Sequence, residues 1–471
     1  MAAVTITMIR TYARRAEKSF PSFQLSEPDD VTSKKALQDS SWADGLRGLA
    51  AVFVVSSHMV IAFCRHLMLP SGSENGPPQL FQRPFFRLIS QGSAWVAIFF
   101  ILSGYVNALK PVKLARAGNV DTALSNLAVS SFRRSFRLFL PGVAATVLSW
   151  FLCQLGAYET ARRSDAYWLY ATSPGPSDSW GTAVEDLVAA IRMTWKFRGE
   201  NPYDQPQWCM FWLLLASMIV FMTLVATVNL TPTYRVLIIS VLYFLSWDWT
   251  RLIGDPFIGI NVYAGILLAE LSHSTYPASL MRYTRVLSPL LCVLGFYLCS
   301  FPSAYPNNAA WSRNLVILAD RLFPDIPQLE RFWPTLGAQI VTLSVIFSPA
   351  LRRMLSHRFL LWLGKVSFPL YLLHGTFMRS LLAWVLYGGR LTVETEEWDD
   401  NVKEHYRVNR IPAPRPLVFF FVLPLWAVVV LSATHLWAVN VEPWFGVITA
   451  KCEDMMFGRE GRSTALPVRM D

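Results

Sequence analysis

An arginine and a histidine share one apolar segment near the amino terminus. Arg47 and His58 are 11 residues apart, and at about 100° per residue both side chains lie on one face of a helix, about 16 Å apart along its axis. Ionisable residues inside apolar segments are costly in a membrane and mark function by default. Such a pair could hold an anionic cofactor by its phosphates and act on its far end. The alternative is that Arg47 reaches lipid headgroups and His58 is a structural interior histidine.

Two further groups of polar residues could take part in this chemistry. Arg133, Arg134 and Arg137 form a basic cluster. Because Arg133 and Arg137 are four residues apart, they share a helical face suited to paired contacts with phosphate oxygens; the alternative is an anchor at the membrane interface. Tyr371 and His374 are three residues apart and also share a face. This allows a hydrogen bond, a joint pocket wall or a purely structural histidine.

Membrane-spanning helices are needed to position these residues. Hydrophobic residues make up 53% of the 471 positions and charged residues only 16%, and apolar runs of about 20 residues are long enough to cross a bilayer as helices. We therefore expect an all-α, polytopic membrane bundle of about ten transmembrane helices. The expected spans are residues 46–64, 92–109, 137–156, 208–229, 234–249, 256–272, 286–302, 333–350, 359–384 and 416–440.

Positive charges set the expected orientation of the bundle. The connections after the second, sixth and eighth spans are rich in Lys and Arg, and such connections stay in the cytoplasm. An even number of spans then places both chain termini in the cytoplasm and the long segments 157–207, 303–332 and 389–415 on the opposite side. The expected organisation is a polar cytoplasmic tail at 1–41, a transmembrane domain at 42–445 and a cytoplasmic tail at 446–471.

Composition and charge exclude other classes of protein. The apolar content rules out a disordered or fibrous chain, and the net charge of +10 is the excess expected of loops that face anionic lipid, so no nucleic-acid partner is expected. The six cysteines and the histidines show no metal-ligand spacing, which predicts no metal site. The first 40 residues lack the apolar core of a cleavable signal. We expect an integral protein of the endoplasmic reticulum or another endomembrane.

Four motifs, in order along the chain, resemble those of the acyltransferase 3 family of membrane-bound O-acyltransferases. The sequence Asp44-Gly45-Leu46-Arg47-Gly48 leads into a helix with an Arg-x10-His spacing, and it resembles the opening of the family. The other three motifs are the aromatic second span ending in Ser103-Gly104-Tyr105, the basic segment Arg133–Pro141, and the late helix Ser367–Gly375 with its tyrosine and histidine. The similarity covers roughly residues 42–445, and the chain is similar to fungal members that acylate small lipophilic products.

The resemblance implies transfer of an acyl group, by default acetyl, from acyl-CoA to a hydroxyl. The acceptor would be a lipophilic small molecule such as a terpenoid or polyketide, and acyl-CoA would be a co-substrate rather than a permanently bound cofactor. A hydroxyl needs a base with a pKa near neutrality, which imidazole supplies. His58 is then the expected base, with His374 and Tyr371 as further catalytic residues. The expected acyl-CoA site comprises Arg47, Arg133, Arg134, Arg137 and, beside the pantetheine arm or in helix packing, Ser103 and Gly104.

One position departs from the family pattern. Fungal members usually show a glutamate five residues after a tryptophan at the start of the fourth span, whereas here Leu213 follows Trp208 at that spacing. Asp248, Asp255 or Glu270 could take its place, or histidine could act alone, or activity could be lost. The rival functions are therefore a proton-linked carrier or flippase that uses Arg47 and His58 as a gate, and a catalytically inactive homologue.

Overall fold

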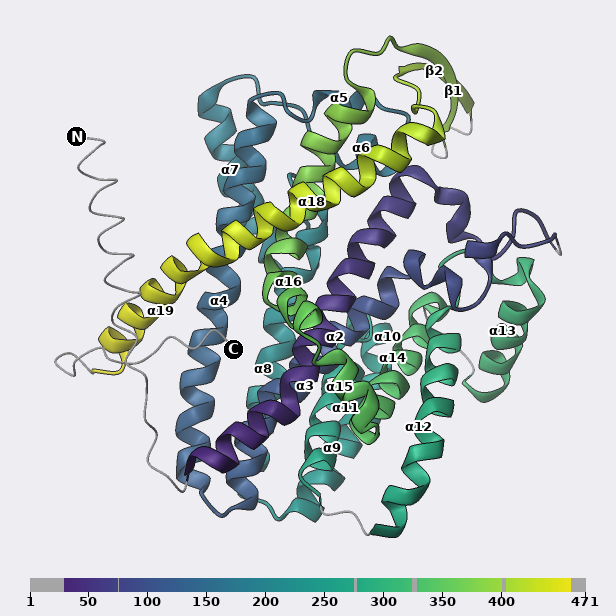
Figure 1. Cartoon of the computed structure of the whole chain (residues 1–471). Helices are drawn as coiled ribbons and strands as arrows, with labels where there is room; N and C mark the ends of the chain where they lie inside the picture. The colour runs from purple at the N-terminus through teal and green to yellow at the C-terminus, as the bar shows by residue number, and fades with distance from the viewer. Residues whose placement is uncertain (1–28, 75, 275–277, 324–327, 400–403, 459–471) are drawn as a thin grey trace.

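The computed structural model describes residues 29–458, apart from 75, 275–277, 324–327 and 400–403, and this part of the chain is almost entirely helical (Figure 1). This confirms the all-α bundle expected from sequence. The longer helices are α2 (Asp29–Phe63), α3 (Gly92–Arg116), α4 (Val120–Gln154), α8 (Cys209–Thr227), α9 (Pro232–Leu245), α11 (Ile258–Ser272), α12 (Ala278–Cys299), α14 (Leu329–Phe347), α16 (Arg358–Phe377), α18 (Pro416–Asn440) and α19 (Glu442–Met456).

Shorter elements form the connections between these helices. The segment 157–207 forms helices, and 389–415 holds a two-stranded antiparallel hairpin in which Val393 pairs with Arg410. These elements are α5 (Glu159–Arg163), α6 (Tyr167–Thr172), α7 (Trp180–Thr194), α10 (Trp249–Ile253), α13 (Ala310–Leu322), α15 (Pro349–Leu355), α17 (Ala383–Tyr387), β1 (Val393–Asp399), β2 (Glu404–Arg410), the 3₁₀ turns Arg65–Met68, Leu80–Gln82, Phe86–Ser90, Gln205–Trp208, Ser246–Asp248 and Pro306–Asn308, and the π turn Met378–Leu382.

Fewer helices than the expected ten have the length and apolar composition of a membrane span in the described part of the chain. Six helices in the described part are long and apolar enough to cross a membrane, or seven if α14 and α15, which meet at a bend of 102°, count as one broken span. The count of ten is therefore not confirmed. The predicted span 256–272 is the 15-residue α11, and the predicted span 333–350 breaks before Pro349, because proline disfavours a helical conformation in the residue that precedes it.

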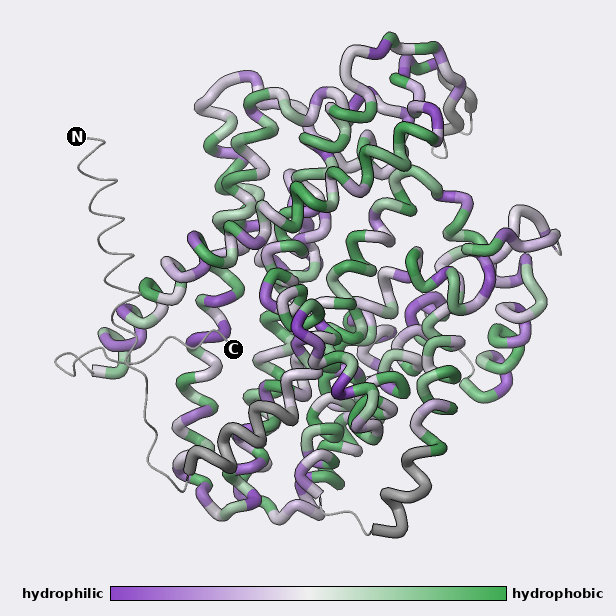
Figure 2. Tube along the Cα trace, viewed as in Figure 1, coloured by the Kyte–Doolittle hydropathy of each residue, from purple (hydrophilic) through white to green (hydrophobic). Residues whose placement is uncertain are grey.

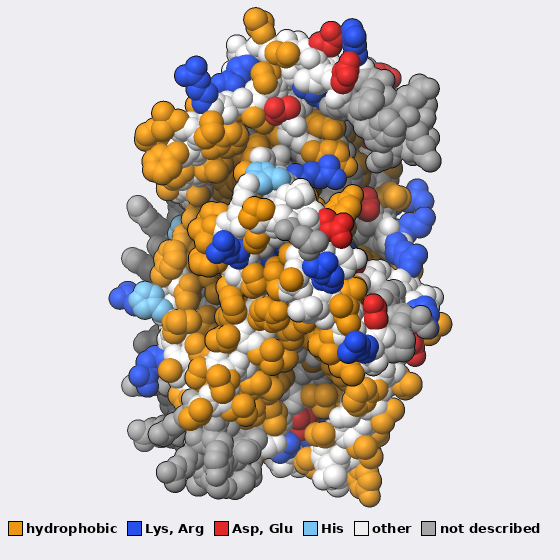
Figure 3. All heavy atoms as spheres, turned by 90° about the vertical axis from the view of Figure 1, so that its right-hand side faces the viewer, with side chains coloured by type: hydrophobic (Ala, Val, Ile, Leu, Met, Phe, Trp, Pro, Cys, Tyr) orange, Lys and Arg blue, Asp and Glu red, His pale blue; other side chains and the backbone are white. Residues whose placement is uncertain are grey.

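The distribution of hydropathy matches a lipid-facing surface. In Figure 2 most helices, α18 above all, are coloured as hydrophobic along much of their length. Figure 3 shows the face that carries α12 and α13, where hydrophobic side chains cover a broad area. Large apolar side chains that a soluble protein would bury are exposed on these helices, such as Phe420 and Phe421 on α18 and Leu290 on α12. Such a surface fits a bilayer.

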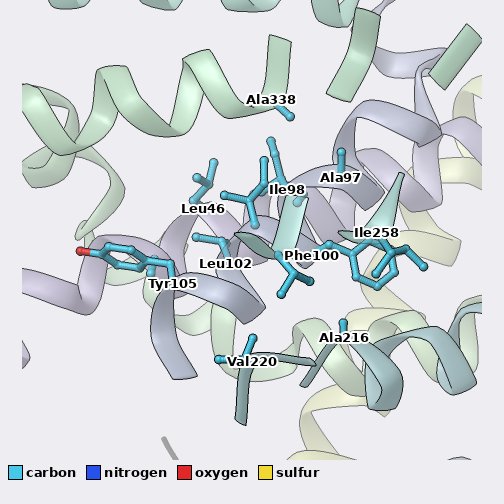
Figure 4. Close-up of a cluster of buried hydrophobic side chains, with 14 of the residues drawn as sticks. Leu46, Ala97, Ile98, Phe100, Leu102, Tyr105, Ala216, Val220, Ile258 and Ala338 are labelled. Atoms are coloured by element: carbon cyan, nitrogen blue, oxygen red, sulfur yellow. The ribbon is translucent and has the colours of Figure 1, made fainter. Parts of the chain in front are cut away.

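The interior is organised around α3, which packs against α2, α8, α11 and α14. Figure 4 shows side chains of these helices converging, among them Phe100 and Ile98 of α3, Val220 of α8 and Ile258 of α11. The close crossing of α3 and α11 depends on small residues. A Cβ atom on Gly104 would lie 2.3 Å from the carbonyl oxygen of Val262, so only glycine allows the two backbones to approach this closely.

Helix α4 corrects the expected setting of the basic cluster. The helix begins at Val120 rather than near residue 137, and so it is 35 residues long. Arg133, Arg134 and Arg137 consequently lie well inside a continuous helix instead of at its entry. Residues 446–456, expected to belong to a polar tail, continue α19.

Candidate active site

The two histidines predicted from sequence are in direct contact. His58 of α2 and His374 of α16 come from helices packed side by side, and His58 Nδ1 lies 2.9 Å from His374 Nε2. Their rings are nearly parallel, with centroids 5.0 Å apart and an interplanar angle of 23°. Close packing of the helices allows this contact, since Gly48 of α2 faces Leu363 and Gly364 of α16 without room for a side chain.

Backbone carbonyls fix the protonation of the pair. His374 Nδ1 lies 2.8 Å from the carbonyl oxygen of Tyr371 and 3.0 Å from that of Leu370. A carbonyl oxygen only accepts hydrogen bonds, so Nδ1 of His374 carries the proton and Nε2 of the neutral ring is an acceptor. His58 Nδ1 must then donate to it. The remaining nitrogen of His58, Nε2, is left with its lone pair.

A row of flat groups continues beyond the histidines. The indole of Trp168, from α6, stacks on His58 with centroids 5.1 Å apart, and the guanidinium of Arg379 lies 4.8 Å from the Trp168 ring centroid. Arg379 Nη1 pairs with Asp204 Oδ1 at 3.0 Å, and both side chains are fully buried. Burial raises the pKa of Asp204 to about 6, against the opposing effect of Arg379. The row places a compensated positive charge near both histidines.

The helix that carries His374 is adapted to bring Arg379 into this row. After Phe377, α16 passes into the π turn Met378–Leu382, which contains Arg379. π turns widen a helix locally and recur at functional sites. Gly375, three residues before the π turn begins, leaves space for the ion pair, because a Cβ atom there would lie 2.4 Å from Asp204 Oδ1 and 3.2 Å from Arg379 Nη1.

His58 and Tyr371 line one cavity of about 300 Å³. Its walls come from α2, from the start of α3, from the Pro206–Cys209 segment before α8 and from the start of α14, and they mix apolar groups with Gln91, Asn261 and Arg331. The hydroxyl of Tyr371 donates to the carbonyl of Pro206 rather than to His374. Of the arrangements expected for Tyr371, the structure therefore shows the pocket wall and not the hydrogen bond.

The connection between α2 and α3, residues 64–91, contributes Met68, Ser90 and Gln91 to the same cavity. Arg87 holds this connection together. Its buried guanidinium donates to the carbonyls of Met68, at 2.9 Å, and Leu69, at 3.3 Å. Burial lowers the pKa of Arg87 to about 10. Arg87 therefore holds Met68 in position at the cavity wall.

The basic residues predicted to bind acyl-CoA divide into two environments. Arg47, Arg134 and Arg137 lie close enough to interact electrostatically, and Glu442 of α19 lies near Arg47 and Arg137. Arg47 also pairs with Asp44 at 2.9 Å. Arg133 instead pairs with Glu453 of α19 through two contacts of 2.6 and 3.1 Å. Three cations thus gather at one place, and Arg133 joins α4 to α19.

The cation cluster and the cavity occupy opposite halves of the same helices. On α2 the cavity is lined by residues 54–61 and the cluster contains Arg47. On α3 the cavity ends at Phe100, about one helical turn before Ser103. Ser103 lies 3.4 Å from Ser217 of α8, and Ser217 accepts a hydrogen bond from Arg134. Ser103 therefore belongs to the polar surroundings of the cations, whereas Gly104 faces α11 and serves helix packing.

None of the three acidic residues considered as replacements at position 213 touches the histidine pair. Asp255 accepts hydrogen bonds from the backbone of Ile258 and Gly259 at the start of α11, and Glu270 pairs with Arg116 and Arg235. Asp248 is not part of the cavity wall. Among the described residues, the carboxylate linked to the histidines is Asp204, through Arg379 and Trp168.

Sequence reasoning missed Trp168, Asp204 and Arg379. Trp168 and Asp204 fall in a segment that was expected to be a loop, and no local pattern connects them to His58. Arg379 did carry a signal, because it is a charged residue inside the predicted span 359–384. No group of three or more His, Cys, Asp or Glu side chains in the described residues has the geometry to hold a metal ion.

Comparison with known proteins identifies the family of the chain. The chain is similar to the O-acetyltransferase PaAT-1 of Phomopsis amygdali, with 28% identity over 79% of each chain. It is also similar to the acyltransferases clz18 of Cochliobolus lunatus, with 24% identity over 74% of this chain and 85% of the relative, and R4 of a Phoma species, with 22% identity over 73% and 85%. No solved structure matches. The family model described as an acyltransferase domain matches residues 40–439, and the chain therefore belongs to the acyltransferase 3 family.

Proposed function

We propose that the protein transfers an acyl group, acetyl by default, from acyl-CoA to a hydroxyl of a lipophilic small molecule, with His58 as the general base. The observation that carries the proposal is the fixed tautomer of the histidine pair. His374 accepts from His58 Nδ1 at 2.9 Å, so the lone pair of His58 Nε2 is available on a side chain that lines the cavity. A base in this position can take the proton of an acceptor hydroxyl.

The reaction balances with these groups. The acceptor oxygen attacks the thioester carbon as His58 Nε2 takes its proton, and a C–O bond forms while the carbonyl electrons move to oxygen. Collapse of this intermediate breaks the C–S bond, and the departing thiolate of coenzyme A receives the proton from His58. During the transfer His58 is an imidazolium that donates to His374, a hydrogen bond strengthened by the charge.

The compensated charge behind Trp168 supports this role. An uncompensated Arg379 near the pair would oppose protonation of His58, and Asp204 offsets that charge at 3.0 Å. Both members are buried, so their interaction is little screened by solvent or salt. Trp168 stacks on the His58 ring, and this contact restricts rotation of the ring.

We propose that Arg47, Arg134 and Arg137 bind the phosphates of coenzyme A. Three arginines with Asp44 and Glu442 nearby still leave an excess of positive charge, and guanidinium groups form paired hydrogen bonds with phosphate. The hydrophobic acceptor would occupy the 300 Å³ cavity on the other side of His58. The name of PaAT-1 supports acetyl as the transferred group and its O-acylation supports a hydroxyl acceptor.

The function is tested by acyl transfer in membranes that contain the protein, radiolabelled acetyl-CoA and an extract of hydroxylated lipids. His58→Ala should lower the rate of ester formation by about 10²–10⁴, and His435→Ala, which changes an exposed histidine on α18, should leave it unchanged. Ester formation by the wild type that persists in His58→Ala contradicts the assignment of the base. Absence of both ester and coenzyme A binding would favour a carrier or an inactive homologue.

The donor site is tested by coenzyme A binding. Arg134→Ala should weaken binding at least tenfold, because a hydrogen bond to a charged group contributes about 1.5–3 kcal/mol. Lys110→Ala removes the same charge from an exposed position on α3 and is the matched control. Equal affinities of the two variants for coenzyme A would contradict this placement of the phosphates.

A further inference from the structure

The amino end of α3 forms part of the wall of the reaction cavity. Gln91, Gly92 and Ser93 all line it, and Gln91 is the residue that precedes a helix of 25 residues. The first N–H groups of a helix have no acceptor within the helix, and the side chain of Gln91 does not cap them. The positive end of the helix dipole and its N–H groups are therefore directed to the place where the cavity begins.

Two side chains at this helix end have hydrogen-bonding atoms without partners among the described residues. They are Gln91 Nε2, on a side chain that is only 1% exposed, and Ser93 Oγ. Other buried glutamines in this part of the protein use their amides, since Gln82 Nε2 donates to the carbonyl of His66 and Gln207 Nε2 donates to Asp204. A buried amide donor left unpaired is destabilising unless another group binds it.

These donors are close to the proposed base. A Cβ atom on Gly92 would lie 2.7 Å from Ser57 Oγ, so the start of α3 is in contact with the residue that precedes His58. The hydroxyl of Ser57 is itself engaged, because it donates to the carbonyl of Val54 at 2.7 Å. Among the described residues, the α3 amino end thus presents unpaired donors next to Ser57 and His58, and these groups are N–H and O–H rather than carboxylates.

We propose that Gln91 and Ser93, with the first N–H groups of α3, bind the oxyanion of the tetrahedral intermediate. This inference rests on the proposed acyl transfer. When the acceptor oxygen attacks the thioester, the carbonyl electrons move to its oxygen, and the preorganised donors of this helix end stabilise the negative charge. As the C–S bond breaks, the C=O bond re-forms and the charge leaves with the thiolate, which His58 then protonates. Donors already oriented for the charge need no rearrangement during the reaction.

The test is the kinetics of acetyl transfer from radiolabelled acetyl-CoA to the hydroxylated lipid that the wild type esterifies. Gln91→Met keeps the volume of the side chain but removes its donor, and kcat should fall about 10²-fold while KM for both substrates changes less than about threefold. Ser93→Ala removes a single hydroxyl and tests the same site in a second, less disruptive variant. It should lower kcat in the same way and by a smaller factor.

Gln82→Met is the matched control, because it makes the same substitution at a buried glutamine of the 64–91 connection outside the cavity wall. Its kcat per folded protein, counted by detergent size-exclusion and thermal unfolding, should stay near that of the wild type. A rise in the acceptor KM with kcat unchanged in Gln91→Met would mean that the helix end binds the acceptor, and this overturns the proposal. Unchanged kinetics, or an equal loss in Gln82→Met, also overturns it. A wild type that forms no ester contradicts the proposed acyl transfer itself.

Discussion

Replacing His374 by leucine tests whether the second histidine fixes the tautomer of the first. The substitution removes the acceptor 2.9 Å from His58 Nδ1 and leaves a buried donor unpaired, at about 1–3 kcal/mol. His58 then gains by moving its proton to Nε2, where it can no longer act as a base. The imidazolium formed during transfer also loses a hydrogen bond to a charged group, about 1.5–3 kcal/mol. Since about 1.4 kcal/mol corresponds to a factor of ten, kcat should fall by about 10²–10⁴.

The assay is single-turnover acetyl transfer at saturating donor and acceptor, so that binding does not contribute to the rate. His374→Gln offers an amide oxygen as a replacement acceptor and should recover at least a tenfold part of the loss. His435→Leu, on the exposed side of α18, controls for removal of a histidine as such. If His374→Leu retained kcat within about threefold of the wild type, the hydrogen-bonded pair would have no part in the reaction, and the reasoning about the tautomer would be refuted.

Two further predictions concern the supporting structure. Asp204→Asn leaves the charge of Arg379 uncompensated near the histidines and should lower kcat at pH 7–8. Because the pKa of Asp204 is about 6, the wild type should lose the contribution of this carboxylate to kcat as the pH falls below about 6. The pH–rate profile of the variant should lack this change, and identical profiles for the two proteins would contradict the prediction. Gly104→Ala places a methyl group 2.3 Å from the carbonyl oxygen of Val262 and should lower the free energy of unfolding by about 1–3 kcal/mol. The control is Gly72→Ala, whose Cβ meets no atom within 4 Å. Equal stability of the two variants would contradict the close packing of α3 and α11.

The part of the site that could be predicted from sequence is the part that depends on the spacing of residues within one helix. Arg47 and His58 share one helix, and a periodic pattern is sufficient to place them on one face. The contact between His58 and His374 joins residues 316 positions apart. A single sequence, considered without an alignment, does not show which distant residues meet in the fold. Tyr371 was expected near His374, but its hydroxyl bonds to Pro206 because the packing of a distant segment decides its partner.

The number of membrane-spanning helices was harder to predict from sequence than the fold class. Apolar composition indicates a membrane bundle whatever the exact spans are, whereas the count depends on where each helix ends. The predicted segment 256–272 is helical but only 15 residues long in α11, and the apolar run 333–350 conceals the break at Pro349. In the same way the basic cluster was expected at the start of a helix, whereas α4 begins at Val120. Helix ends depend on tertiary packing, which hydropathy does not record.

The π turn at Met378–Leu382 makes the length of this helix, and not only its sequence, a determinant of the site. A π turn accommodates one residue more than an α-helical turn, so it behaves as an insertion held within a continuous helix. Deleting Met378 would restore regular α-helix and move Arg379 to the preceding helical position, about 100° around the axis. Arg379 would turn away from Trp168 and Asp204 although every side chain in the row is still encoded. Comparisons of family members by residue type alone would miss such a change, whereas a one-residue gap after the late histidine would reveal it.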